Sequence, residues 1–319
     1  MGTTVLLSHH FPADSEAILQ AVSADVRLLR LPKGNAPLPV GAEAAEVLAW
    51  WEGRNGGLAE LRPRLPRLRW VQAPAAGIGD QRLHLVLGND VTLTSAAGVY
   101  GDLVAEHALT LMLALYKRLP ELLDLQRRGV WDDLPTRSLT GQTLGIVGAG
   151  GIGRATARLA RPFGMRAIGV RRGEGAVPEL DQTLPLERLP DMLAAVDVVL
   201  LATPLTDRTR GMVDAAFLRA MRPTAVLINV ARGGIVVTDD LLQALHEGWI
   251  GGAGLDVTDP EPLPEGHPLW RAPNTIITPH HANPPEASHE PIARRFAENL
   301  HRYLAGEPLL AVVDPERGY

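Results

Sequence analysis

The segment at residues 143–172, TLGIVGAGGIGRATARLARPFGMRAIGVRR, constrains the fold of this chain more than any other. An apolar run at Leu144–Val147 enters a turn with three glycines, and a helical pattern follows. A second apolar run, Ala167–Val170, then ends in two arginines. A strand, a glycine turn, a helix and a second strand within about thirty residues form the unit that binds a dinucleotide pyrophosphate.

Each of the three glycines has a separate physical task in such a unit. Gly148 permits the tight turn off the strand, and Gly150 lets the backbone approach the pyrophosphate without a Cβ in the way. Gly153 lets the helix pack close to the sheet. The helix N-terminus then offers unpaired N–H groups and a positive dipole end to the phosphates. The segment therefore predicts a nicotinamide or flavin cofactor, and the alternative is a tight strand–helix turn without a ligand.

Composition and charge exclude several classes of protein. A chain of 319 residues suggests about two domains, and 46% hydrophobic residues are enough to form real cores. The net charge of −5 argues against broad nucleic-acid binding. The chain has no cysteine, which excludes disulfides, thiol nucleophiles and Cys-ligated zinc and fits a reducing compartment. The N-terminus lacks signal-peptide features, so we expect a soluble, cytoplasmic protein with no membrane partner.

Apolar runs alternate with helical patterns along the chain, which indicates parallel α/β units. Strands are expected at 3–8, 26–31, 47–51, 68–73, 91–94, 197–202, 225–230, 252–257 and 275–278, in addition to the two of the glycine unit. Helices are expected at 14–22, 101–119, 215–221, 239–247 and 286–304. A last apolar run, Leu309–Val313, is expected to return to the first domain as a strand.

Polar side chains follow three of these strands, at the edge where parallel sheets bind ligands. Arg232, Glu261 and His280 each come shortly after their own predicted strand. Histidine can deliver a proton to a ketone oxygen as hydride reaches carbon, and a neighbouring carboxylate favours the imidazolium. A guanidinium binds a substrate carboxylate and polarises the carbonyl. Together they suit hydride exchange between a 2-hydroxy acid and its 2-oxo acid.

Each of these residues also has an ordinary structural interpretation. Arg232 alone is more often a surface cation, and Glu261 in a Pro-rich loop is ordinarily solvated. His280 and His281 can form a structural pair, and His289 adds a third histidine, but the spacing matches no zinc pattern, so no metal is predicted. The joint placement of Arg, Glu and His at one edge favours the catalytic interpretation.

Several segments resemble the D-isomer-specific 2-hydroxyacid dehydrogenase family, and the resemblance covers nearly the whole chain. The segments are VGAGGIG (147–153), INVARGG (228–234), GAGLDVTDPEPLP (252–264), TPHHA (278–282), AAGI (75–78) and AAGVYGDLVAEHALTLMLAL (96–115). The resemblance implies an α/β fold of two Rossmann-like domains with parallel sheets, the nucleotide-binding domain being inserted into a flavodoxin-like substrate domain. The expected limits are 1–98 and 285–319 for the substrate domain and 99–284 for the NAD(P)-binding domain.

Carried over position by position, the resemblance implies that Arg232 binds substrate, Glu261 supports the histidine and His280 is the acid/base. Asp256 matches a residue at the nicotinamide end of the cofactor, the alternative being a turn residue at a strand end. The predicted cofactor-binding positions are Gly148, Gly150, Gly151, Ile152, Gly153, Arg171, Arg172, Thr203, Pro204, Val230, Ala231, Asp256 and His280.

Substrate contacts are predicted in the first domain as well. Backbone N–H groups at Ala76, Gly77 and Ile78 are expected to hold the substrate carboxylate, and the alternative is a plain glycine turn. Trp51 and Tyr100 lie in segments that border the family's substrate cleft, although packing explains each of them equally well.

The end of the glycine unit departs from the usual pattern of an NAD site. Arg171 stands where an acid would pair with a ribose 2′-hydroxyl, and Arg172 follows it. An anion would repel a 2′-phosphate, whereas guanidinium groups bind one bidentately. The sequence therefore favours NADP(H) over NAD(H), the alternative being that both arginines point to solvent and NAD is used.

The expected reaction is reduction of glyoxylate, hydroxypyruvate or a similar small 2-oxo acid to a D-2-hydroxy acid. Two alternatives stay open: a nicotinamide-sensing, corepressor-like interaction protein, and an enzyme of the same family that acts on phosphoglycerate, phosphite or another acid. The helix at 101–119, apolar on much of its circumference, is expected to support a homodimer, as the resemblance also implies. Its alternative is burial between the two domains.

Overall fold

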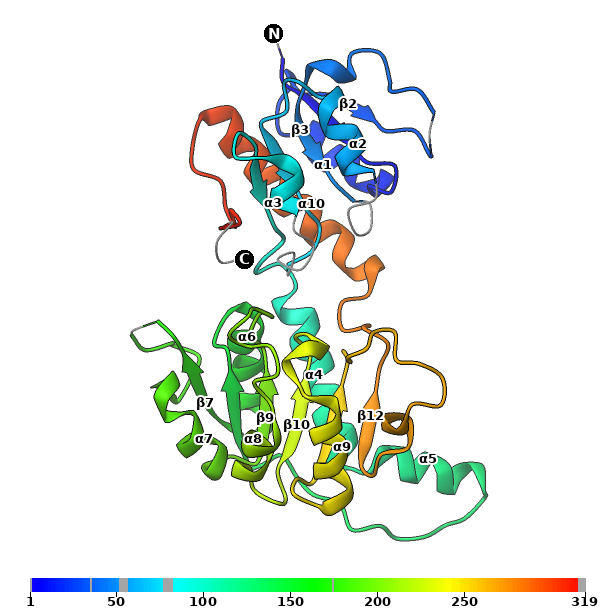
Figure 1. Cartoon of the computed structure of the whole chain (residues 1–319), viewed down its shortest axis with the longest axis vertical. Coiled ribbons are helices and arrows are strands. Elements are labelled where there is room, and N and C mark those ends of the chain that lie inside the picture. Colours follow the sequence, from blue (N-terminus) through cyan, green and yellow to red (C-terminus); the bar gives the residue numbers. More distant parts are fainter. Residues whose placement is uncertain (1, 35, 52–56, 77–82, 174, 315–319) are drawn as a thin grey trace. The chain divides into compact units, whose positions relative to one another are not determined.

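The computed structural model describes residues 2–34, 36–51, 57–76, 83–173 and 175–314 (Figure 1). The chain divides into two compact units: Met1–Tyr100 with Pro284–Tyr319, and Gly101–Asn283. Each unit is built on a parallel β-sheet of its own. The assignment of one unit to the substrate and the other to the cofactor stays a prediction.

The first unit has a sheet of five parallel strands in the order β2-β1-β3-β4-β5. The strands are β1 (Thr4–Leu7), β2 (Arg27–Arg30), β3 (Ala45–Ala49), β4 (Trp70–Gln72) and β5 (Thr92–Thr94). The helices are α1 (Glu16–Gln20), α2 (Leu58–Leu61), α3 (Leu83–Leu87) and α10 (Pro285–Ala305). This strand order is that of the flavodoxin-like doubly wound fold.

Both faces of the first sheet are buried. Val5 and Leu7 belong to one apolar cluster, which includes Phe296 of α10, whereas Leu6 between them belongs to the cluster on the opposite face. Successive strand residues point to opposite faces, so a strand covered on both sides has to be a continuous apolar run. That is why TVLL reads as a strand in the sequence without any alternation.

The second unit has a sheet of seven parallel strands in the order β12-β11-β10-β9-β6-β7-β8. The strands are β6 (Thr143–Val147), β7 (Arg166–Arg171), β8 (Gln182–Pro185), β9 (Val198–Leu201), β10 (Val226–Asn229), β11 (Gly252–Leu255) and β12 (Thr275–Ile277). The helices are α4 (Gly101–Tyr116), α5 (Leu119–Arg127), α6 (Gly151–Ala160), α7 (Leu189–Ala195), α8 (Ala215–Ala220) and α9 (Thr238–Glu247). Counted from β6, the order is the Rossmann order 3-2-1-4-5-6 with one further strand.

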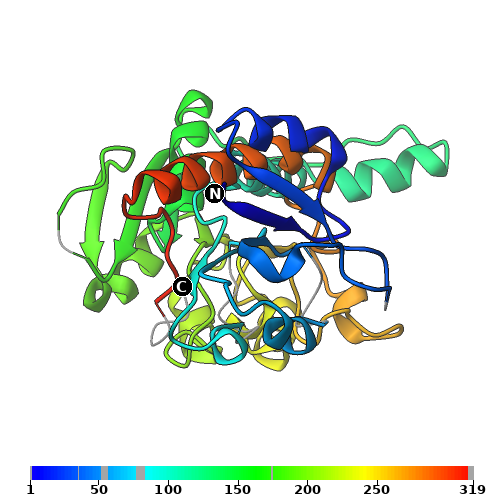
Figure 2. The same ribbon diagram turned by 90° about the horizontal axis from the view of Figure 1, so that it is seen from above.

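Helices cover both faces of this second sheet. Helix α4 packs against α6 and against strands β10 and β11, while α8 packs between α7 and α9 (Figure 1). Helix α5 projects away from the sheet as an arm (Figures 1 and 2). No helix in the described part of the chain combines the length and the apolar character needed to span a bilayer.

Several elements differ from the sequence-based expectation, and the short helices α2, α3 and α7 were not expected at all. The helix expected at 101–119 ends at Tyr116, because Arg118 adopts a left-handed conformation with φ 50° and a new helix begins at Leu119. Strand β8 was not expected, since QTLP has no apolar run and lies at the sheet edge. The run at 309–313 forms no strand; Val312 pairs with Thr94 through an isolated antiparallel bridge, next to a left-handed Ala311.

Candidate active site

The three glycines of the turn after β6 have the geometry that their predicted tasks require. Gly148 has φ 103°, and a Cβ there would lie 2.6 Å from the carbonyl oxygen of Ala202. A Cβ on Gly153 would lie 2.4 Å from the carbonyl oxygen of Gly148, so the helix packs directly against the turn. A Cβ on Gly150 would meet open space. The turn is therefore closed on its protein side and open where a pyrophosphate would lie.

Helix α6 begins immediately after this turn, with Gly150 as its N-cap and no side chain hydrogen-bonded as a cap in the described residues. Gly151, Ile152 and Gly153 therefore form an uncapped first turn, which is the arrangement that binds phosphate. The predicted positions Thr203 and Pro204 follow β9 and lie beside the turn, since a Cβ on Gly148 would lie 2.8 Å from the Thr203 nitrogen. The backbone N–H groups at the start of α6 fit a dinucleotide pyrophosphate.

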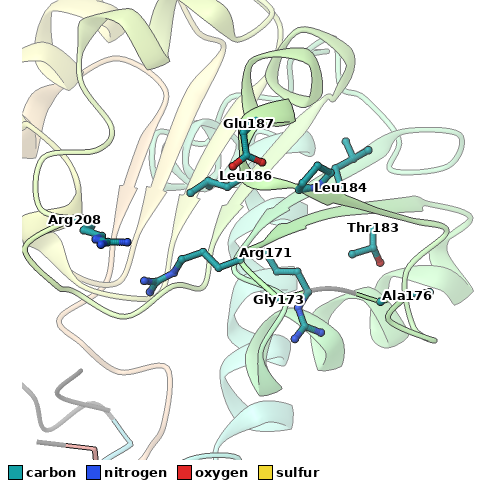
Figure 3. A pocket seen from close by; sticks show the side chains of 11 residues that line it. Arg171, Gly173, Ala176, Thr183, Leu184, Leu186, Glu187 and Arg208 are labelled. Carbon is teal, nitrogen blue, oxygen red and sulfur yellow. The ribbon is translucent and has the colours of Figure 1, made fainter. Parts of the chain in front are cut away.

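A pocket of about 630 Å³ lies at the end of β7 and is lined by Arg171 and Arg172 (Figure 3). It also contains Arg208 and Glu187, which the sequence analysis did not single out. Arg208 follows β9, which is two positions from β7 in the sheet, with β6 between them. It is 36 residues or more from the two arginines in the sequence, so the fold and not the local sequence brings it to this pocket. Three guanidinium groups and one carboxylate thus line the site predicted for the adenosine ribose.

Strands β10, β11 and β12 are adjacent and parallel, with Leu255 opposite both Asn229 and Ile277. The three predicted catalytic residues follow these strands at one edge of the sheet. His280 Nδ1 lies 2.8 Å from Glu261 Oε1, and the two side chains are 40% and 34% exposed. The pair predicted from strand ends is therefore formed, and both of its side chains are partly exposed.

The turn that carries Arg232 is tied to the loop that carries Glu261. A Cβ on Gly233 would lie 1.9 Å from the carbonyl oxygen of Thr258, so the two loops touch there. Buried Asn229 accepts a hydrogen bond from Ala231 N and donates one to the Arg232 carbonyl oxygen, at 3.1 Å each. Arg232 itself is half-buried, and its Nη1 donates to the Ala231 carbonyl oxygen at 2.7 Å. Val230 and Ala231 are buried at the end of β10.

Asp256, at the end of β11, is 2% exposed, and its carboxylate is hydrogen-bonded within the protein. Burial raises the pKa of this carboxyl, but hydrogen bonds from His107, Thr278, His281 and Ala282 outweigh burial and lower it to about 2. These hydrogen bonds are those of a turn residue at a strand end, which was the alternative interpretation of Asp256. A contact with the nicotinamide stays a prediction.

The predicted substrate positions of the first unit are placed in part. Trp51 packs edge-on against Phe11 with ring centroids 4.9 Å apart, and its backbone N–H donates to Ser8 Oγ. Tyr100 is buried and donates to the Pro74 carbonyl oxygen, and burial raises the pKa of its phenol. Ala76 is half-buried, while Gly77 and Ile78 lie outside the described residues. These observations fit packing and leave the substrate roles as predictions.

Within the described ranges, no group of three or more His, Asp or Glu side chains lies close enough together to hold a metal ion.

Comparisons with known proteins agree with this geometry. Residues 109–282 match the family described as D-isomer specific 2-hydroxyacid dehydrogenase, NAD binding domain. The human glyoxylate reductase/hydroxypyruvate reductase is 35% identical over 96% of each chain. The D-isomer specific 2-hydroxyacid dehydrogenase of Xanthobacter autotrophicus Py2, solved with NADPH and MES, superposes with a TM-score of 0.86 at 31% identity, covering 100% of this chain and 99% of that one.

A third relative has the same architecture. The NADPH-dependent glyoxylate/hydroxypyruvate reductase of Sinorhizobium meliloti, solved with NADP and sulfate, has a TM-score of 0.84 at 26% identity and covers 99% of this chain and 100% of its own. The matched segment contains the glycine turn, and the fold agrees over both units. The family matched is one of oxidoreductases that use a nicotinamide cofactor. The chain therefore belongs to the D-isomer specific 2-hydroxyacid dehydrogenase family.

Proposed function

We propose that this protein reduces a small 2-oxo acid, of the glyoxylate or hydroxypyruvate kind, to a D-2-hydroxy acid with NADPH in preference to NADH. The observation that carries the proposal is the 2.8 Å contact between His280 Nδ1 and Glu261 Oε1, at the sheet edge that also carries Arg232. The reductase activities of the human and Sinorhizobium meliloti relatives support the choice of substrate.

In this proposal each polar group has one task. Arg232 binds the substrate carboxylate and polarises the carbonyl, together with backbone N–H groups at 76–78. The nicotinamide, when bound, supplies the hydride. His280 gives a proton to the carbonyl oxygen from Nε2, because Nδ1 faces Glu261, and that carboxylate fixes the ring and stabilises the imidazolium.

Asp256 is proposed to contact the nicotinamide end of the cofactor. Among the described residues its Oδ2 accepts one hydrogen bond, from Ala282 N at 3.1 Å. A carboxylate oxygen has about two lone pairs, so Oδ2 keeps one for the carboxamide N–H of a nicotinamide. The turn role and the cofactor role of Asp256 are therefore compatible.

The preference for NADPH rests on the pocket at the end of β7. Arg171, Arg172 and Arg208 line it together, and guanidinium groups bind phosphate through charge-assisted, bidentate hydrogen bonds. Glu187 in the same pocket opposes a phosphate, but the arginines outnumber it. Relatives solved with NADPH and with NADP support the same choice.

The test is a panel of 2-oxo acids assayed with NADPH and NADH. The proposal expects the highest kcat/KM for glyoxylate or hydroxypyruvate with NADPH. A clear advantage for NADH would refute the cofactor preference, and activity confined to phosphorylated or bulky acids would refute the substrate class.

We also propose a cytoplasmic homodimer. In the stretch from α5 to residue 131, Leu123 and Val130 are exposed and Trp131 is fully exposed. The helix at 101–119 was expected to support the dimer, but most apolar residues of α4 are buried against α6, β10 and β11. Exposed apolar side chains are typical of association surfaces, so we assign the arm instead to a second copy of the chain. The lack of cysteine supports a reducing compartment.

A further inference from the structure

Three successive backbone N–H groups of the loop after β12 point at one residue. His280 N donates to the Asp256 carbonyl oxygen at 2.8 Å. His281 N donates to Asp256 Oδ1 at 2.8 Å, and Ala282 N donates to Asp256 Oδ2 at 3.1 Å. The loop that carries the proposed acid/base is therefore tied to Asp256 by three amides in a row, one on its backbone carbonyl and two on its carboxylate.

His280 needs such support because its own backbone is strained. Its φ is 53°, in the left-handed region that a residue with a Cβ avoids. Residues in such conformations persist only where the surroundings over-determine them, and they cluster at functional sites. Whatever fixes Asp256 thus also fixes the backbone from which the His280 ring extends.

A hydroxyl and an imidazole complete the surroundings of Asp256. Thr278 Oγ1 donates to Asp256 Oδ1 at 2.6 Å, which uses the one proton that a hydroxyl has. His107 Nε2 lies 2.8 Å from the same Thr278 oxygen, so His107 must be the donor in that contact. His107 Nε2 also lies 3.3 Å from Asp256 Oδ1, and the two side chains are 18% and 1% exposed.

Helix α4 holds His107 in a fixed place relative to Asp256. A Cβ on Gly254 of β11 would lie 3.0 Å from the Cβ of Leu111 of α4, so helix and strand are in close contact. Leu111 is one helical turn from His107, and Asp256 follows Gly254 by two residues. The His107 imidazole therefore extends from a helix that is packed on the sheet, and it lies at the end of strand β11.

We propose that His107 is a positioning residue for His280, acting through the chain His107–Thr278–Asp256 to hold the loop at 278–282. The inference rests on the proposed function for its catalytic meaning. Without His107, Thr278 Oγ1 and Asp256 Oδ1 both lose the N–H group that faces them. The loop can then relax from the left-handed conformation of His280. A displacement of about 1 Å at a catalytic group can cost roughly a hundredfold in rate.

The experiment compares His107→Phe, which keeps a flat ring without a donor, with His107→Gln, which restores an N–H on a side chain of similar reach. Leu109→Ala, a buried truncation on the same helix, is the matched control for lost stability. Four quantities are measured on the full-length protein: kcat with hydroxypyruvate, KM, the Kd for NADPH, and amide hydrogen exchange of a peptide spanning 278–282.

For His107→Phe we expect kcat to fall about 10- to 100-fold, the range for loss of a residue that orients a catalytic ligand. KM and the NADPH Kd are expected to change less than about threefold, and exchange in the 278–282 peptide is expected to accelerate. His107→Gln restores most of kcat and protection, and Leu109→Ala lowers Tm without either effect.

The proposal is overturned if His107→Phe keeps the kcat of the wild type and its protection from exchange at 278–282. It is also overturned if Leu109→Ala, at the same Tm as His107→Phe, loses as much kcat as His107→Phe does. The exchange measurement needs no substrate. If the wild-type enzyme reduces no 2-oxo acid, the proposed function fails while the exchange result still decides whether His107 holds the loop.

Discussion

Asp256→Asn tests the role of the buried carboxylate in the stability of the second unit. The pKa of this carboxyl is lowered from 3.8 to about 2, which at about 1.4 kcal/mol per pKa unit is a stabilisation of roughly 2 kcal/mol. Asparagine also turns one acceptor into an N–H donor that faces the N–H of His281 or Ala282, an unsatisfied contact that costs about 1–3 kcal/mol. The expected loss at pH 7 is therefore about 3–5 kcal/mol.

The loss has a characteristic dependence on pH. Because the folded-state pKa of Asp256 is depressed, its stabilisation is fully present above about pH 4 and disappears as the pH falls through 2. The neutral asparagine lacks this term at every pH. The difference in free energy of unfolding between wild type and Asp256→Asn should thus narrow by about 1 kcal/mol between pH 7 and pH 3.

Urea unfolding at pH 7, 5, 4 and 3 measures this difference, with the transition of the second unit followed separately if the two units unfold apart. Asp133→Asn, which makes the same change of charge at an exposed position, is the control and should change stability by less than about 0.5 kcal/mol. A difference at Asp256 below 1 kcal/mol, or one that widens toward pH 3, would refute the reasoning.

Four further variants test the cofactor site, the glycine turn and the arm. Arg208→Ala should lower kcat/KM for NADPH about tenfold or more and leave NADH nearly unchanged, in steady-state assays; equal losses with both would contradict the phosphate role. Gly153→Ala should destabilise by about 1–3 kcal/mol in urea unfolding, because its Cβ would lie 2.4 Å from a carbonyl oxygen. Gly150→Ala, with open space around its Cβ, should keep the stability yet weaken the cofactor Kd. Trp131→Asp should shift the molecular mass in light scattering from dimer to monomer; a monomeric wild type would refute the dimer.

The parts of the site that sequence predicts are those governed by local or periodic rules. Gly148 and Gly153 could be assigned tasks because the unit from β6 to β7 is contiguous. The contact between Glu261 and His280 could be anticipated because both follow parallel strands, and parallel strands end at one edge.

The remaining parts depend on contacts that no local pattern encodes. His107 meets Thr278 across 171 residues, and nothing in a helical EHAL segment marks its histidine as a partner of a strand end. Arg208 lies in the same pocket as Arg171 because β7 and β9 are the two neighbours of β6 in the sheet. The sequence alone does not reveal that order. Strand β8 lacks an apolar run because it lies at the sheet edge, where none of its four residues is fully buried.

The most direct test of the central claim is turnover of hydroxypyruvate and NADPH by wild type and by His280→Ala, followed as loss of NADPH absorbance, with the configuration of the product determined. General acid catalysis by a positioned side chain contributes about 10²- to 10⁴-fold. The proposed mechanism predicts a D-2-hydroxy acid from the wild type and a loss of that size in His280→Ala. Wild-type turnover in His280→Ala, or an L-configured product, would contradict it.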